Sequence, residues 1–300
     1  MRRLAPWTVV IGLAVLAGGV AVPDAHAQGT LLPDLDQELP DELQVAASGR
    51  GADRSFWLGF SSAVSNIGDG PLVINGHRPN RRSKAMVADQ LIAREGLPPA
   101  VAPRVARLRY VRSPDHNHWH VLKFERYKLR RAGRKGAVVR DRKSGFCLGD
   151  RYEVDGPALS GSPEEPVYTS RCGLGQRQLL GLTEGISVGY GDRYSPYLEY
   201  QQLPLDGLRP GRYVLKHRVN VRRRLRETSL ANNSASVLLS VRWRHGRPRL
   251  RLLRSCPDSG RCDDPGAGSS ETASRPDRLP TRSRRAALAA SADPFLCNLP

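Results

Sequence analysis

Hydrophobic and polar residues alternate over short stretches along most of the chain, and clusters of glycine, proline, asparagine and aspartate separate these stretches. A period of two residues is typical of β-strands that bury one face. Only residues 84–95 form a candidate helix. Several short strands joined by turns predict a mainly β fold, with a β-sandwich-like core, long loops and little helix. The strands are expected at 55–60, 71–74, 120–129, 211–221 and 235–243, with a turn at 66–70.

The first 27 residues have the composition of an export signal. Two arginines give a charged start, residues 7–22 form an apolar run, and residues 25–27 read Ala-His-Ala, an A-x-A cleavage site. The apolar run is shorter than the roughly 20 residues that span a bilayer, so we expect a signal peptide over 1–27 rather than a retained membrane anchor. The mature chain is then expected to begin at Gln28 and to be secreted to the extracellular space, with no membrane span after processing.

The chain beyond residue 245 changes in composition. Arginines at 247, 249 and 251 alternate with a proline and a leucine, which is the pattern of a basic edge strand. Residues 257–295 consist mostly of Ser, Asp, Arg, Pro, Gly and Ala, and have too few large apolar side chains to form a core of their own. The sequence therefore predicts one folded domain over 28–245, followed by a basic, largely disordered tail over 246–300.

The net charge of +18 comes almost entirely from arginine, since only six of the 47 basic residues are lysine. Such a surface could bind nucleic acid, anionic cell-envelope polymers or lipid headgroups. Export and the absence of a nucleic-acid motif argue against nucleic acid. The charge therefore favours anionic envelope polymers as partners, and it does not specify any chemistry.

Five cysteines suit an oxidising compartment. Cys147 and Cys172 lie within the expected domain, Cys256 and Cys262 lie close together after it, and Cys297 is near the end. We expect Cys147–Cys172 and Cys256–Cys262 disulfides with Cys297 left over, although the sequence alone leaves the connectivity open.

Three of the chain's seven histidines, His116, His118 and His120, alternate along one short segment. Alternate residues of an extended strand share a face. From the first to the third histidine a straight strand covers roughly 13 Å, whereas a metal ion sits about 2 Å from each imidazole nitrogen, so the strand must bend for all three to share an ion. Imidazole suits copper, zinc, nickel and iron, with Cu²⁺ leading in affinity. The segment predicts a metal site, and three solvated histidines are the alternative.

Several motifs resemble those of the lysyl oxidase family, which are copper amine oxidases with a protein-derived quinone. The resemblance covers residues 31–242, and no single motif decides it, but their common order is specific. The motifs are Leu32-Pro33-Asp34-Leu35, Asn66-Ile67-Gly68-Asp69-Gly70-Pro71-Leu72, the H-x-H-x-H copper motif at 116–120, K-x-x-F-C-L-x-D at 143–150, the tyrosine motif at 185–194, and Gly211, Tyr213, Leu215, Asn220, Glu227 and Asn232-Asn233.

This resemblance implies a cofactor, lysine tyrosylquinone, formed from Lys143 and Tyr194, beside copper held by the three histidines. A primary amine, small or peptidyl lysine, would be oxidised by O₂ to an aldehyde, with release of ammonia and hydrogen peroxide. Tyrosines at 190, 197 and 200 flank Tyr194 and could form a packing cluster, but the Asp192-x-Tyr194 spacing favours 194. Asp192 is a candidate for the proton-abstracting base, with a structural turn carboxylate as its alternative role.

The chain departs from the family pattern at three places. Gly149 replaces a usual acidic residue, Tyr200 stands where vertebrate members have a cysteine, and Asn220-Val221 replaces Asn-Pro. These differences affect the expected substrate specificity and disulfide framework more than they affect the metal site.

Two other functions remain open. A secreted copper-binding or envelope-binding β-domain without catalysis would leave Lys143 and Tyr194 unlinked. A zinc hydrolase would use three histidines with an open fourth position and would need no quinone. The sequence does not identify the amine.

Overall fold

The computed structural model describes residues 29–113, 116–141, 143, 145–198 and 200–266, together with the backbone of 281–283. The expected signal peptide and Cys297 lie outside the described residues. Within these ranges the chain is mostly β, with one turn of 3-10 helix at Gly51–Asp53. In this part of the chain, no helix has the length and apolar character needed to cross a membrane.

The first sheet has seven strands in the order β11-β8-β7-β6-β5-β13, with β1 paired to β6. Neighbouring strands in this sheet are antiparallel. The short β11 is at one edge of this sheet, next to β8. His120 lies in β8, and Lys143 lies in the loop just before β11. The strands are β1 Thr30–Leu31, β5 Leu72–His77, β6 Ala85–Arg94, β7 Leu97–Tyr110, β8 Trp119–Leu122, β11 Gly145–Phe146 and β13 Gly181–Ile186.

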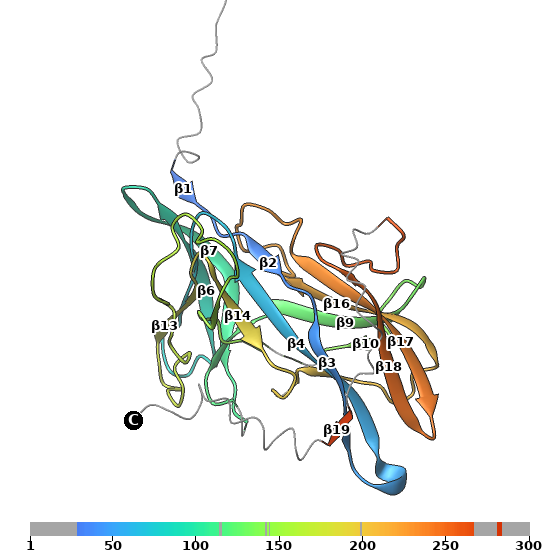
Figure 1. Ribbon diagram of the computed structural model, residues 1–300. Helices are drawn as coiled ribbons and strands as arrows, with labels where there is room; N and C mark the ends of the chain where they lie inside the picture. The colour runs from blue at the N-terminus through green and yellow to red at the C-terminus, as the bar shows by residue number, and fades with distance from the viewer. Residues whose placement is uncertain are drawn as a thin grey trace, which may run out of the picture.

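The second sheet has five strands in the order β10-β9-β16-β17-β18. In Figure 1 the green β9 lies beside β16, and the orange β17 and β18 complete the sheet. The strands are β9 Glu125–Arg131, β10 Val139–Arg140, β16 Gly211–Val219, β17 Ser234–Arg244 and β18 Arg247–Cys256. The expected basic edge strand is therefore confirmed as β18, and the described fold continues through a Cys256–Cys262 disulfide to Gly266, past the expected boundary at 245.

The third sheet is arranged around the long strand β4, which pairs with four other strands. Its order is β12-β14-β4-β3-β19, with β2 and β15 also paired to β4. The strands are β2 Leu35–Gln37, β3 Asp41–Ser48, β4 Ser55–Asn66, β12 Tyr152–Glu153, β14 Tyr190–Tyr194, β15 Gln202–Pro204 and β19 Thr281–Ser283.

A single hydrophobic core joins the three sheets. Buried side chains from each of them, such as Leu108, Leu58 and Leu239, belong to one cluster of packed residues. The mainly β, sandwich-like fold expected from the alternating pattern is thus confirmed.

Two expectations about individual elements were wrong. The candidate helix at 84–95 is the strand β6, in which Met86, Ala88, Gln90 and Ile92 are buried in alternation and which has β5 and β7 on either side. The single strand expected over 120–129 is two strands, because the backbone turns at Lys123, whose φ is 63°. Strand pairing, rather than local preference, decides both conformations. β6 pairs with β5 and β7, whereas β8 and β9 belong to different sheets.

Candidate active site

Lys143 and Tyr194 come from different parts of the fold and lie in contact. Lys143 is in the loop between β10 and β11, and Tyr194 is the last residue of β14. The Lys143 Nζ atom lies 3.8 Å from the centroid of the Tyr194 ring and 4.7 Å from that of Phe146. The two rings pack edge to face with their centroids 5.0 Å apart. The predicted lysine amine therefore faces the ring of the predicted tyrosine.

The amine of Lys143 lies in a site that disfavours its protonated form. Burial lowers the pKa of Lys143 to about 7, although the nearby carboxyl groups of Glu125 and Asp192 act in the opposite direction. Its Nζ donates a hydrogen bond of 3.0 Å to Oε1 of Gln201. Arg142, the neighbour of Lys143 in the sequence, lies outside the described residues. Near neutral pH a large fraction of the amine is unprotonated and nucleophilic.

The hydroxyl group of Tyr194 is held by two acceptors. It lies 2.7 Å from the carbonyl oxygen of Cys147 and 2.9 Å from Oδ2 of Asp192. Burial, followed by the charge of Asp192, raises the pKa of Tyr194 well above its usual value. The phenol is therefore protonated and fixed in orientation.

Two buried carboxyl groups flank the lysine and tyrosine. Burial raises the pKa of Asp192 to about 8, against the effect of Arg151, whose Nε lies 4.0 Å from Asp192 Oδ1. Burial likewise raises the pKa of Glu125 to about 7, while a 2.7 Å hydrogen bond from Ser62 Oγ opposes the shift. Asp192 lies within β14 rather than in a turn. Both groups could accept or release a proton near neutral pH.

Sequence reasoning missed Glu125 and Gln201. Glu125 shares the buried face of β9 with Tyr127 and Leu129. The alternation of this segment therefore placed a carboxylate on the inward face, and that was the sequence feature that could have identified it. Gln201 is buried, and its Oε1 accepts hydrogen bonds from Lys143 Nζ at 3.0 Å and from the Tyr127 hydroxyl at 3.3 Å. No pattern in the sequence marks Gln201, because its two partners are distant in the chain: Lys143 lies in the loop before β11, and Tyr127 lies in β9.

The three predicted histidines gather beside this site, but not along one strand. His120 lies in β8, whereas His116 and His118 precede it in a loop. The ring centroids are 5.5, 5.3 and 4.6 Å apart for the 116–118, 116–120 and 118–120 pairs. The expected bend thus arises because residues 116–118 lie in a loop and, of the three histidines, only His120 is in a strand. Pro114, just before this segment, lies outside the described residues.

The histidine nitrogens suit a metal in their chemistry. The Nε2 atoms of His118 and His120 are 2.7 Å apart, close to the roughly 2.8 Å between two ligands at right angles, each about 2 Å from an ion. Burial and mutual repulsion lower the pKa of His118 to about 4 and that of His120 to about 2, which keeps both in the neutral, metal-binding form. The buried Nδ1 of His120 has no hydrogen-bond partner among the described residues.

These donors do not amount to a preformed site. Among the described residues, no group of three or more His, Cys, Asp or Glu side chains is placed so that it could hold a metal ion as it stands. The residue types and the clustering therefore fit a metal, while binding requires the side chains to reorient.

A disulfide ties the segments of the site together. Cys147 and Cys172 are joined, as expected, as are Cys256 and Cys262. The Trp119 N–H, at the start of β8, donates to the carbonyl oxygen of Cys172 at 2.9 Å. The Cys147 carbonyl in turn accepts from Tyr194. The Cys147–Cys172 bridge thus connects the histidine segment to the tyrosine.

Comparison with known proteins relates this chain to one family. The model of the lysyl oxidase family matches residues 98–246. Lysyl oxidase homolog 1 of Homo sapiens is 27% identical over 122 residues, which are 39% of this chain and 18% of the relative. Protein-lysine 6-oxidase of Sus scrofa is 26% identical over 122 residues, with 39% of this chain and 41% of the relative covered. The matched part spans less than half the length of each. Residues 98–246, which include the three histidines, Lys143 and Tyr194, therefore belong to the lysyl oxidase family.

Proposed function

We propose that this protein is a copper-dependent oxidase of primary amines whose organic cofactor forms from Lys143 and Tyr194. The observation that carries the proposal is the 3.8 Å distance from Lys143 Nζ to the centroid of the Tyr194 ring, in a chain related to the lysyl oxidases. One relative is named protein-lysine 6-oxidase, and we extend to this chain the oxidation of a primary amine. Two disulfides support a location outside the cytoplasm.

His116, His118 and His120 would hold the copper. Bound there, copper would bring O₂ and redox chemistry that unmodified side chains lack. The strand pairing of β8 with β11 supports this arrangement, because it carries His120 close to the loop of Lys143. A Cβ on Gly145 would lie 2.9 Å from His120 Cβ, so the glycine permits the close approach.

The chain's own residues would prepare the lysine and the tyrosine to join. Lys143 supplies a partly unprotonated amine, and Gln201 orients it through its Oε1. Asp192 positions the Tyr194 hydroxyl and can take up its proton. Joining the Lys143 nitrogen to the Tyr194 ring as a quinone consumes two O₂ and yields one water and one hydrogen peroxide. In turnover, amine, O₂ and water then give aldehyde, ammonia and hydrogen peroxide.

Mass spectrometry of the aerated, copper-loaded protein tests this proposal. A Lys143–Tyr194 linked peptide should be found, heavier than its two parts by one oxygen atom less four hydrogen atoms, together with a visible quinone band. Tyr194→Phe should abolish both, whereas Tyr190→Phe, four residues earlier in the same strand, should keep them. Unmodified Lys143 and Tyr194 peptides from protein that has bound copper would contradict the oxidase proposal and favour a non-catalytic metal-binding domain.

A further inference from the structure

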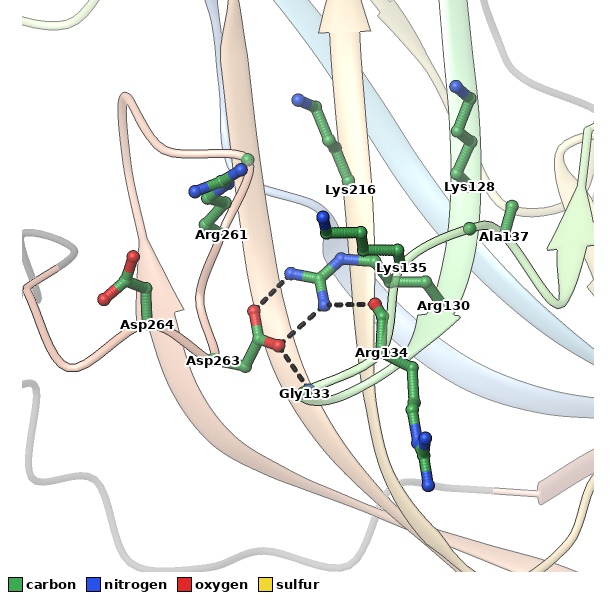
Figure 2. A pocket seen from close by; sticks show the side chains of 12 residues that line it. Lys128, Arg130, Gly133, Arg134, Lys135, Ala137, Lys216, Arg261, Asp263 and Asp264 are labelled. Carbon is green, nitrogen blue, oxygen red and sulfur yellow. Dashed lines mark hydrogen bonds and ion pairs between the residues drawn. The ribbon is translucent and has the colours of Figure 1, made fainter.

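A basic pocket lies on the outer face of the second sheet. Residues alternate in direction along β9 and β16, so Tyr127 and His217 face the core while Lys128 and Lys216 face the other way. The pocket has a volume of about 540 Å³. Six cationic side chains line it: Lys128, Arg130, Arg134, Lys135, Lys216 and Arg261 (Figure 2).

Like charges stand directly opposite each other across these two strands. Lys216 pairs in register with Lys128, and Arg218 pairs with Arg126. Figure 2 shows the side chains of Lys128 and Lys216 extending in the same direction from neighbouring strands. Directly opposed like charges destabilise a sheet, so this arrangement costs the fold some stability.

Two of the nearby carboxylates are already engaged by arginines, whereas Asp264, which also lines the pocket, accepts the Gly266 N–H at 3.2 Å. Asp263 forms a two-pronged ion pair with Arg130 and accepts the Gly133 N–H at 2.7 Å, while Asp141 lies 3.6 Å from Arg126. Within the described part of the chain, neither Lys128 nor Lys216 makes a hydrogen bond or ion pair. Two ammonium groups are thus left without a counter-charge in direct contact.

The surroundings of Lys216 are strongly cationic. Burial, together with the charges of Arg218, Lys128, Arg130 and Arg261, lowers the pKa of Lys216 to about 8. An anion held between the two lysines would relieve this repulsion.

The walls of the pocket are held in place without a ligand. One wall is the loop 132–138 after β9, and the other is the loop closed by the Cys256–Cys262 disulfide. Asp263 joins them, because it binds both Arg130 and the Gly133 N–H (Figure 2). A ligand would therefore meet a formed recess.

We propose that this pocket binds a phosphate-bearing anion, with Lys128 and Lys216 as its direct ligands. Several lysines around one recess suit a compact group with more than one negative charge, since ammonium binds phosphate as a point charge. Lys135 and Arg261 line the same pocket and would contact a second phosphate. The site uses neither Lys143 nor Tyr194, so it stands independently of the amine oxidase proposal.

Calorimetric titration of the full chain with inorganic pyrophosphate at neutral pH tests the site. We expect one ion per chain, with affinity falling as sodium chloride is raised. Lys128→Gln and Lys216→Gln should each weaken binding about tenfold, the loss expected when one charge-assisted contact is removed. Each variant should also raise the melting temperature, because it removes a like-charge neighbour.

The control is Arg247→Gln combined with Arg249→Gln, which removes two charges from exposed positions of β18 outside the pocket. It should leave pyrophosphate affinity unchanged. Equal weakening by the control and by the combined Lys128→Gln/Lys216→Gln variant would show diffuse attraction instead of a site. No pyrophosphate binding at all would also overturn the proposal.

Binding to vesicles of phosphatidylglycerol, compared with vesicles of phosphatidylcholine, identifies the source of the phosphate. Lysine-dependent capture alongside pyrophosphate binding indicates a lipid phosphate, and pyrophosphate binding without capture indicates a soluble phosphate.

Discussion

Among single residues, the chemistry of Lys143 depends most closely on its surroundings. Burial moves the pKa of its ammonium to about 7, and Gln201 gives the amine a neutral acceptor rather than a carboxylate partner in direct contact. An ion pair at this position would stabilise the charged form and remove the nucleophile. The environment therefore favours reaction over a structural role.

Lys143→Arg should abolish the cross-link and the release of peroxide from a primary amine. A guanidinium stays protonated and is a poor nucleophile, so the variant should bind copper and fold like the parent while losing activity. Lys84→Arg, at an exposed lysine before β6, serves as the control and should retain full activity. Peroxide release by the Lys143 variant at the parent's rate would falsify the assignment of this lysine.

Cross-link formation should accelerate with pH across the neutral range. The free amine of Lys143 is the reactive form, and with a pKa of about 7 its fraction rises about tenfold between about pH 6 and pH 8, then levels off. The pKa values of His118 and His120, about 4 and 2, keep both rings neutral over this range. The measurement is the yield of linked peptide against time at saturating copper. A rate that continues to climb above pH 9 would show that Lys143 titrates as an ordinary exposed lysine.

At the scale of elements, the short pair β8–β11 decides how close the histidines come to the lysine loop. Leu122 pairs with Gly145 and Val121 with Phe146, so the two strands approach over only two residues. At Gly145 the space for a side chain is taken by the Val121 carbonyl oxygen, 2.7 Å from where a Cβ would lie. The absence of a side chain is therefore required for the pairing itself.

Gly145→Ala should push β11 away from β8 and weaken copper binding. Overpacking of this kind costs about 1–3 kcal/mol of unfolding free energy. Gly181→Ala is the matched control in the same sheet, because its Cβ would meet the Gly76 carbonyl oxygen at an ordinary 3.6 Å. Urea unfolding and copper titration of both variants are the measurements. If the Gly145 variant matches the parent in both, the close approach is unnecessary for the metal site.

At the scale of the whole molecule, the described chain is held together by one core and two disulfides of different reach. Cys147–Cys172 closes a span of 25 residues and connects the histidine segment to the tyrosine, while Cys256–Cys262 closes a span of six next to the basic pocket. Loop-closure entropy makes the longer span the more stabilising one.

Removing the longer bridge should therefore destabilise the protein more than removing the shorter one. Cys147→Ala/Cys172→Ala should lower the unfolding free energy by about 3.5 kcal/mol, and Cys256→Ala/Cys262→Ala by about 2 kcal/mol. The Cys147→Ala/Cys172→Ala variant should also bind copper more weakly. The backbone carbonyls of residues 147 and 172 accept hydrogen bonds from Tyr194 and Trp119, and without the disulfide these two carbonyls are no longer tied together. Chemical denaturation of the two double variants gives the comparison, and the reverse order of stabilities would contradict it.

The sequence by itself determined the mainly β fold class and the relation of residues 98–246 to the lysyl oxidases, and it favoured the two disulfide pairs that the structure then established. The alternation of residues was sufficient to predict the strands expected at 211–221 and 235–243. A strand that buries one face has apolar residues at every second position, and this pattern is visible in the sequence. The basic alternation at 247–251 likewise marked a real edge strand. The motifs carried the family, while the assignments of metal ligands and cofactor residues drawn from them remain proposals.

Only the tertiary structure decided which groups meet and in what protonation state. β6, where a helix was expected over 84–95, took its conformation from the strands β5 and β7 on its two sides, and a local sequence pattern does not contain that information. Gln201 and Glu125 became parts of the site because three sheets converge on one core. The pKa values of Lys143 and Asp192 follow from burial. Burial and cross-strand neighbours arise from contacts between residues far apart in the chain, and for that reason the sequence pattern could not supply them.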